Sequence, residues 1–437
     1  MARVLISTFG SSGDLNPYLA VSTALKSRGH EPVIATMPAY GPKILNRGVG
    51  FYAVRPSLGL DPAIVRQIMD PSKGTEFLIR QVLIGQLNGA YQDLSAAADA
   101  FQPDLIITHP ASFSGPLVAE TRKLPWLSSV LSPMSLFSAD DPPAYDRVPW
   151  LLPVQRRFKI MTRILIALGR RMSNGWVAPY HALRIELGLP PTSNPLFEGL
   201  WSNQGVLALF SSILGPPQRD WPANVTVTGF PIDDGGRLDG TRLATSPELA
   251  RFLDMGAPPL VFALGSAAVF RPGDFFEVAA AAAQSLGRRA VLVLGETPQV
   301  EIAGHENLFV CRDATSFAEL FPRAAAIIHQ GGIGTLARAM ASGKPSLIVP
   351  FAFDQPDNAA RLSRLGSALS IPRQRWTKAR AIKGLETLLS DTKIAETAAR
   401  IGAAVSAENA SEAAADAIER FLGDRIRGQK TAGSSHA

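Results

Sequence analysis

The stretch His329-Gln330-Gly331-Gly332-Ile333-Gly334-Thr335 follows the apolar run 324–328 and precedes the helical pattern 336–341. This order predicts a buried strand, a glycine-rich turn and a helix. The glycines allow a tight turn, and the free N–H groups that begin the helix favour an anion. We therefore predict a phosphate-binding turn. It is not a nucleotidase P-loop, because Gly343-Lys344-Pro345 has proline where a magnesium-binding hydroxyl is required.

A second polar motif lies downstream of this turn. Asp354 and Gln355 follow the apolar run 346–351 and open a helical pattern that stops at Gly366. They are therefore expected at the carboxyl edge of a parallel sheet, where ligands bind. A carboxylate and an amide beside a phosphate turn suit the hydroxyls of a sugar.

Together these motifs resemble the donor signature of the family 1 glycosyltransferases, two-domain enzymes that move a sugar from a nucleotide diphosphate to a small acceptor. The resemblance rests on residues 329–335, 350–351 and 354–359, which keep the family's order and spacing. Bacterial members like the rhamnosyltransferase subunit of rhamnolipid synthesis are also similar over 216–222 and 228–231. The similarity extends from the first strand to about residue 425. It implies an α/β protein of the GT-B fold, with two facing Rossmann-like domains and a cleft between them.

Length and composition agree with two domains. The chain has 437 residues, 46% of them hydrophobic, which is enough for two cores of about 200 residues each. We predict an acceptor-binding domain over 1–230, a linker over 231–247, a donor-binding domain over 248–410 and a disordered tail over 428–437. The resemblance adds that a C-terminal helix, 411–425, returns to the first domain.

Cysteine content and the N-terminal residues indicate a compartment. Cys311 is the single cysteine, so no intrachain disulfide is possible and a reducing environment is the simpler interpretation. Neither a signal peptide nor a bilayer-spanning segment is recognisable. We expect a soluble cytoplasmic protein, with its oligomeric state unassigned.

The net charge of +6 is compatible with anionic partners such as nucleotide sugars and acidic lipids. Because no aromatic-rich module accompanies the basic residues, nucleic acid is not expected as a partner. The basic stretch 156–171 alternates cations with apolar residues. It predicts either an amphipathic helix in peripheral contact with a membrane or a helix that covers the acceptor pocket.

The first loop, residues 9–17, lacks the glycine spacing of a dinucleotide-binding fingerprint, which disfavours a nicotinamide enzyme. The resemblance implies that Asp14 is the general base for the acceptor hydroxyl. The alternative is a structural aspartate that caps a helix starting near Pro17. By the same resemblance, His109 falls close to the position of a residue that supports the base. It is expected to contact Asp14 or the acceptor, unless it is a structural hydrogen-bonding residue.

The resemblance also assigns the donor side. It implies that Asp354 and Gln355 hold the sugar, and that the diphosphate contacts Ser266, His329, Gly331, Gly332, Gly334 and Thr335. The nucleobase segment departs from the family pattern at Ala314, and Phe317 is a candidate to replace the usual platform, so uracil and thymine both stay open. No Asp-x-Asp motif occurs, and we predict transfer without metal or another cofactor.

These inferences predict an inverting hexosyltransferase. The donor is a UDP- or dTDP-linked hexose, with glucose ranked ahead of rhamnose. The acceptor is a hydroxylated lipophile: a flavonoid or other phenol, a polyketide, a sterol or a hydroxy fatty acid. Two alternatives remain, namely an enzyme resembling UDP-GlcNAc 2-epimerase and a catalytically silent sugar-nucleotide-binding protein.

Overall fold

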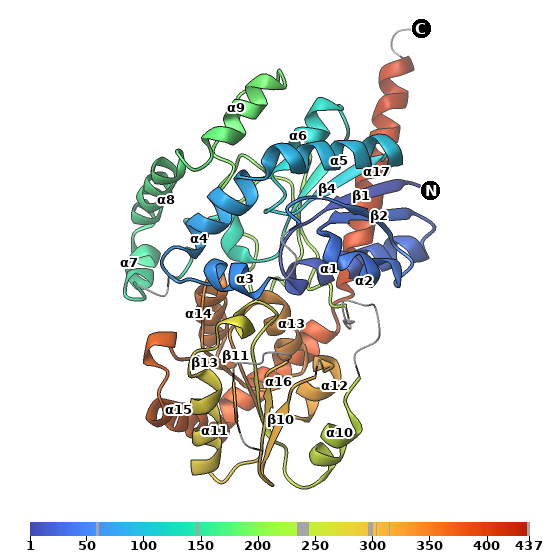
Figure 1. Ribbon diagram of the computed structural model, residues 1–437. Helices are drawn as coiled ribbons and strands as arrows, with labels where there is room; N and C mark the ends of the chain where they lie inside the picture. Colours follow the sequence, from blue (N-terminus) through green and yellow to red (C-terminus); the bar gives the residue numbers. More distant parts are fainter. Residues whose placement is uncertain are drawn as a thin grey trace.

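The computed structural model describes residues 1–57, 61–145, 148–233, 244–295, 300–302, 304–313 and 315–434. It contains two parallel sheets, each flanked by helices, in two domains that face each other (Figure 1). The predicted α/β architecture of two Rossmann-like domains is confirmed. Residues 234–243 of the predicted linker and Ala314 of the nucleobase segment lie outside the described residues.

The first sheet has the order β3-β2-β1-β4-β5-β6-β7. Its strands are β1 (Arg3–Ser7), β2 (Glu31–Thr36), β3 (Gly50–Ala53), β4 (Leu105–Thr108), β5 (Trp126–Val130), β6 (Val206–Ala208) and β7 (Val225–Val227). The α-helices of this half are α1 (Ser12–Ser27), α2 (Gly41–Leu45), α3 (Pro62–Ile68), α4 (Gly74–Phe77), α5 (Leu87–Phe101), α6 (Ser114–Thr121), α7 (Leu151–Arg157), α8 (Lys159–Ser173) and α9 (Ala178–Glu186). A π-helix, Leu78–Ile84, separates α4 from α5.

The second sheet has the order β10-β9-β8-β11-β12-β13. Its strands are β8 (Leu260–Ala263), β9 (Ala290–Val293), β10 (Leu308–Cys311), β11 (Ala326–His329), β12 (Ser346–Ile348) and β13 (Ala368–Ser370). Its helices are α10 (Pro247–Asp254), α11 (Phe275–Ser285), α12 (Phe317–Leu320), α13 (Ile333–Ala341), α14 (Gln355–Leu365), α15 (Lys378–Ser390) and α16 (Thr392–Ser406).

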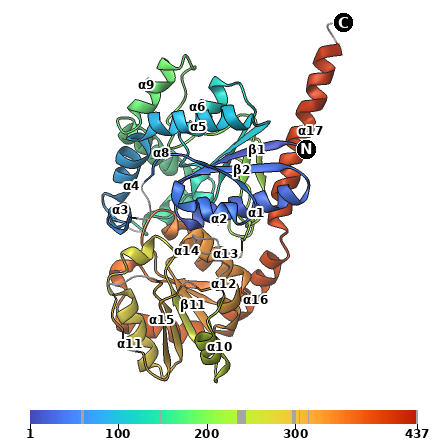
Figure 2. The same ribbon diagram turned by 45° about the vertical axis from the view of Figure 1, so that its right-hand side comes forward.

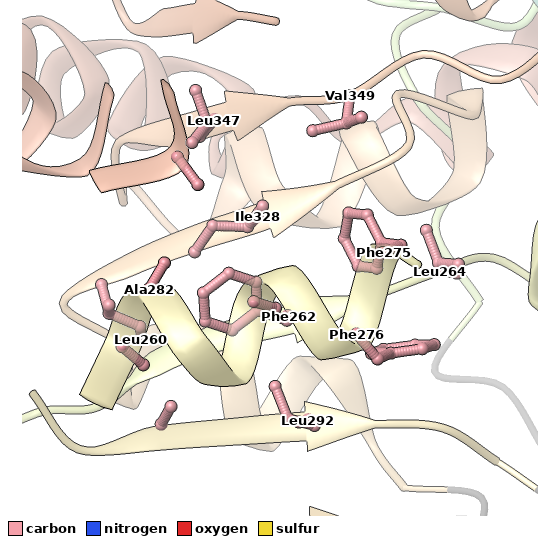
Figure 3. Close-up of a cluster of buried hydrophobic side chains, with 14 of the residues drawn as sticks. Leu260, Phe262, Leu264, Phe275, Phe276, Ala282, Leu292, Ile328, Leu347 and Val349 are labelled. Atoms are coloured by element: carbon pink, nitrogen blue, oxygen red, sulfur yellow. The ribbon is translucent and has the colours of Figure 1, made fainter. Parts of the chain in front are cut away.

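Apolar packing between sheet and helices fixes the second domain. Phe262 of β8 and Phe275 of α11 meet edge to face, and Trp376 stacks on Phe275 with ring centroids 5.4 Å apart. Figure 3 shows Phe262 and Phe275 within the buried apolar cluster between α11 and the neighbouring strands. Because the central strands are buried on both faces, they are continuous apolar runs and not alternating ones. This packing gives the residues that follow β8 and β11 a rigid base.

The last helix, α17 (Ala410–Ser434), packs on α1 of the first domain (Figure 2). Arg28 at the end of α1 forms ion pairs with Glu412, Asp416 and Glu419 at 2.6, 2.7 and 2.8 Å. Helix α17 continues to Ser434, into the tail over 428–437 that the sequence predicts to be disordered; residues 435–437 lie outside the described range. Extending an existing helix avoids the cost of nucleating a new one. None of the helices in the described part of the chain has the length and apolar character needed to cross a bilayer.

Candidate active site

Both sheets reverse their strand order at one point, and predicted site residues follow the strands at those points. In the first sheet the reversal lies between β1 and β4, which precede Asp14 and His109 respectively. In the second it lies between β8 and β11, which precede Ser266 and the glycine turn. Ligands of open parallel sheets bind in the crevice at such reversals. The topology therefore places two halves of one site opposite each other.

Asp14 lies in the first turn of α1. The helix begins at Ser12, with Ser11 as its N-cap, so the expected start near Pro17 is wrong. The Asp14 carboxylate accepts hydrogen bonds from the Ser11 N–H at 2.7 Å and the Ser11 hydroxyl at 2.9 Å. Pro17 is the sixth residue of this helix, where it lacks the N–H that would donate to the Gly13 carbonyl. Asp14 therefore caps the helix and also occupies the predicted catalytic position.

His109 stands next to Asp14. Its Nε2 lies 3.6 Å from Asp14 Oδ1, and its Nδ1 accepts a hydrogen bond from the Ala111 N–H at 3.0 Å. In the neutral ring the proton is therefore on Nε2, facing the carboxylate. The ring also packs edge to face with Tyr18, with centroids 5.9 Å apart. These contacts hold the imidazole so that it orients Asp14.

The surroundings of Asp14 settle the direction of its pKa shift. Burial by itself raises the pKa of the carboxyl, but the hydrogen bond and charge of His109 and the hydrogen bonds from Ser11 outweigh that effect. The pKa of Asp14 is consequently below its ordinary value. The residue is a carboxylate at neutral pH, able to accept a proton but only weakly basic.

The glycine turn forms the opposite wall. Gly331 has a φ of +85°, a conformation that side chains other than glycine rarely adopt, and Gly332 is the N-cap of α13. The Gly331 N–H donates to Nδ1 of His329 at 3.1 Å. His329 is fully buried, and burial lowers its pKa to about 3, so the ring is neutral with its proton on Nε2. That Nε2 has no hydrogen-bond partner among the described residues.

The N-termini of α1 and α13 meet across the cleft. A Cβ atom added at Gly334 would lie 3.4 Å from Cα of Gly13, so the two first turns touch. Each helix directs the positive end of its dipole toward the space between the domains. A diphosphate placed there would receive hydrogen bonds from α13 while Asp14 remained on the side of α1.

Two polar residues at the start of α14 complete the donor side. The Asp354 carboxylate accepts a hydrogen bond from Asn358 at 2.8 Å. The pKa of Asp354 is raised to about 7, because burial and the negative charge of Asp14 together outweigh the hydrogen bond from Asn358, which lowers it. Gln355 Oε1 accepts hydrogen bonds from the backbone N–H groups of Phe351 at 2.8 Å and Ala352 at 3.1 Å. Its amide nitrogen is therefore the part left to contact a ligand.

One cavity of about 1270 Å³ joins these groups. Its wall contains most of the predicted site residues: Asp14, His109, Ser266, Phe317, Gly332, Gly334, Thr335, Asp354 and Gln355. His329 and Gly331 lie behind the wall, where His329 accepts the Gly331 N–H and so supports the turn. Phe317 borders the cavity and also stacks on Phe321, with centroids 4.5 Å apart, so it serves both the pocket and the core.

Some residues of the site were missed from the sequence. Lys43 is buried on the cavity wall, its Nζ donates to Asn16 at 2.7 Å, and burial lowers its pKa to about 8. No motif in the sequence around Lys43 indicates that it belongs to the site. Ser11 was detectable, because Ser-x-x-Asp at a helix start is the spacing of a capping box.

Comparisons with known proteins find relatives over almost the whole chain. The sequence profile described as Erythromycin biosynthesis protein CIII-like, C-terminal domain, matches residues 309–421. O-mycaminosyltylonolide 6-deoxyallosyltransferase of Streptomyces fradiae is 31% identical, over 97% of this chain and 98% of its own length. The chain belongs to the family 1 glycosyltransferases. This glycosyltransferase is also similar to sterol 3-beta-glucosyltransferase of Pichia angusta, 27% identical over 95% of the chain and 33% of that enzyme.

Solved structures assign the fold of this glycosyltransferase as GT-B. The glycotransferase of kitacinnamycin covers 96% of this chain and 99% of its own, with 20% identity and a TM-score of 0.72. Spinosyn rhamnosyltransferase SpnG complexed with thymidine diphosphate covers 96% and 100%, with 16% identity and a TM-score of 0.69. Neither the epimerase nor the silent binder considered from the sequence finds support in these likenesses.

Proposed function

We propose that this glycosyltransferase moves a sugar from a dTDP- or UDP-sugar to a hydroxyl of a lipophilic acceptor of polyketide or sterol type. The observation that carries the proposal is one cavity bordered by the Asp14–His109 pair, by the N-terminus of α13 and by Asp354. The similar enzymes named for O-mycaminosyltylonolide and for sterols support the acceptor class. The cytoplasmic location expected from the sequence stays a prediction.

The proposed reaction is a single displacement with inversion. The acceptor hydroxyl gives its proton to Asp14, its oxygen bonds to the anomeric carbon, and the bond from that carbon to the diphosphate breaks. Because the pKa of Asp14 is low, proton transfer is late, when the hydroxyl has become acidic by forming the new bond. The N–H groups of α13, with Thr335 and Ser266 on the same wall, take up the charge of the leaving diphosphate.

The lining of the cavity supports an apolar acceptor. Sites for one drug-sized ligand typically measure about 300 to 1000 Å³, and this cavity exceeds that range, which leaves room for a donor and an acceptor together. Beyond the Asp14–His109 pair its wall is largely apolar. Phe137 and Phe197 contact each other with ring centroids 4.7 Å apart, and the π-helix Leu78–Ile84 contributes Leu78, Ile79 and Leu83. π-Helices are frequent at functional sites. An apolar wall selects a lipophilic acceptor by burying its surface.

We expect dTDP-rhamnose to outcompete UDP-glucose for one acceptor, which reverses the order inferred from the sequence alone. Phe353 directly precedes Asp354 on the cavity wall and holds a φ of +56°, rare for a bulky residue. Its ring offers an apolar surface that suits the methyl group of a 6-deoxy sugar better than a hydroxymethyl group. The measurement is the ratio of the two products formed from an equimolar donor mixture.

Variants then assign the preference to residues. Asp354→Ala should lower kcat/KM for the preferred donor by about tenfold to a hundredfold, the range for leaving a buried hydrogen-bonding group unpaired. Phe353→Ala should chiefly reduce the ratio of rhamnose to glucose transfer. A strong preference for glucose restores the first ranking, and indifference of both donors to Asp354→Ala removes this residue from sugar recognition.

We expect turnover to persist in EDTA, because the groups that face the diphosphate position are N–H and hydroxyl donors. The assay compares initial rates of the purified protein before and after chelation, with added magnesium as a third condition. If EDTA abolishes turnover and magnesium restores it, the metal-free mechanism is wrong.

A further inference from the structure

Helix α8 exposes a row of large apolar side chains. Ile160, Ile164, Leu168 and Met172 recur every fourth residue, and their exposed fractions are 62%, 56%, 49% and 69%. We call these four residues the apolar stripe. Trp150, just before α7, and Phe158, between α7 and α8, are also exposed, at 67% and 54%. Six of the eleven exposed large hydrophobic residues in the described part of the chain therefore fall between positions 150 and 172.

The opposite face of α8 is buried and partly polar. Thr162 and Ser173 are almost fully covered, as is Gln155 of α7. The side chains of Thr162 and Gln155 have no hydrogen-bond partner among the described residues. A surface helix ordinarily buries its apolar side and exposes its polar side. Helix α8 lies at the edge of the first domain (Figure 1). Its apolar side is the exposed one, which is typical of a binding surface.

The charges around the stripe indicate what it binds. Neither α7 nor α8 contains an acidic residue. Lys159 and Arg170 are neutralised by Asp140 and Glu198, at 2.8 and 2.9 Å. The remaining cations near the stripe include Arg157, Arg163 and Arg171, which are exposed and form no ion pair with an acid in the described ranges. A cationic apolar surface complements an anionic lipid bilayer.

The stripe lies one layer of side chains away from the cavity. On the inner side of α8, a Cβ atom added at Gly169 would lie 3.2 Å from the ring of Phe197. The Arg170 guanidinium lies 5.5 Å from the centroid of the same ring. Phe197 and its partner Phe137 both border the cavity. A bilayer in contact with α8 would therefore lie beside the apolar part of the cavity.

We propose that α7 and α8 dock on an anionic membrane surface, with the apolar stripe and Trp150 inserted among the lipid headgroups. At fifteen residues α8 is too short to span a bilayer and lies along its surface. This inference rests on the proposed function. Docking in this orientation places the acceptor part of the cavity next to the bilayer, where lipophilic acceptors concentrate. Through Gly169 the helix packs on Phe197, which borders the cavity, and its apolar stripe is exposed on another side.

The test is sedimentation of the full chain with vesicles in the absence of substrates. Vesicles of phosphatidylcholine alone are compared with vesicles that contain phosphatidylglycerol. Wild-type protein should bind the anionic vesicles, and Ile164→Ser/Leu168→Ser should lower the bound fraction by about tenfold or more. Arg163→Gln/Arg171→Gln should weaken binding and reduce its sensitivity to salt. Ile185→Ser/Met255→Ser is the matched control, because it removes two hydrophobic residues elsewhere that are more exposed than Ile164 and Leu168.

Two results would overturn the proposal. One is equal vesicle binding by wild type and the stripe variant. The other is a dimer, or a complex with a protein, that the stripe variant dissociates while anionic vesicles bind neither form. Turnover of a water-soluble acceptor should be the same in wild type and the stripe variant. The vesicle assay uses no substrate and therefore tests membrane docking alone. Absence of transfer activity in the wild-type protein would count against the proposed function and not against membrane docking.

Discussion

Asp14→Asn is expected to lower turnover by about a hundredfold or more, the usual scale for losing a positioned general base. The amide keeps the size of the side chain and can still accept the hydrogen bonds from Ser11, so the fold and donor binding should be preserved. What it loses is the capacity to take the proton of the acceptor hydroxyl. The measurement is kcat for one acceptor at saturating donor, together with the Kd of the nucleotide diphosphate.

Ser11→Ala is the matched control for this variant. It removes the cap at the same helix start but leaves the Asp14 carboxylate and His109 in place. It should cost about 1 kcal/mol of stability with a small effect on turnover. If the two variants lose turnover equally, Asp14 has a capping role and not a catalytic one. The pH profile adds a second readout: because the base form exists above a depressed pKa, wild-type turnover should fall only in strongly acidic solution.

Arg361→Met is expected to destabilise the protein by about 3 to 5 kcal/mol, the cost of leaving a buried acid unpaired. Arg361 of α14 is 3% exposed, donates to Asp357 at 2.7 Å and also pairs with Asp141 of the first domain. The second oxygen of Asp357 accepts the Ala144 N–H at 3.0 Å, so the network joins the two domains beside the cavity. Burial raises the pKa of Asp357 despite the opposing charge of Arg361. Urea unfolding or a melting temperature measures the loss.

Arg364→Met is the control for this network. Arg364 lies one turn further along α14, pairs with the same Asp141 at 3.3 Å and is 36% exposed. An ion pair in contact with water contributes about 1 kcal/mol or less, so this variant should stay close to wild type. If both variants lose the same free energy of unfolding, the burial of Asp357 is not the source of the destabilisation. Adding Asp357→Leu to Arg361→Met should recover part of the stability, because no buried charge then lacks a partner.

Local features of the site were readable from the chain because they depend on neighbours in sequence. The turn at 331–334 needs glycine at a positive φ and free N–H groups at the start of a helix, and both requirements appear as residue types at fixed spacing. The apolar runs before it predicted buried parallel strands, and the two sheets confirmed them. The predicted start of α1 near Pro17 was wrong: proline is typical of the first helical turn, but the Ser-x-x-Asp capping box before it begins the helix at Ser12.

Contacts between distant segments were decided by the tertiary structure. The strand order brings Asp14 to His109, and domain packing brings Gly13 against Gly334 and Asp357 against Ala144. No local pattern encodes these pairs, because each depends on how whole strands and domains are placed. The same holds for the basic helix α8. Its periodicity predicted an amphipathic helix. Packing against Phe197 determined which side is buried, and the apolar side is the exposed one. The face of a helix that is buried depends on which side chains the neighbouring segments can accommodate.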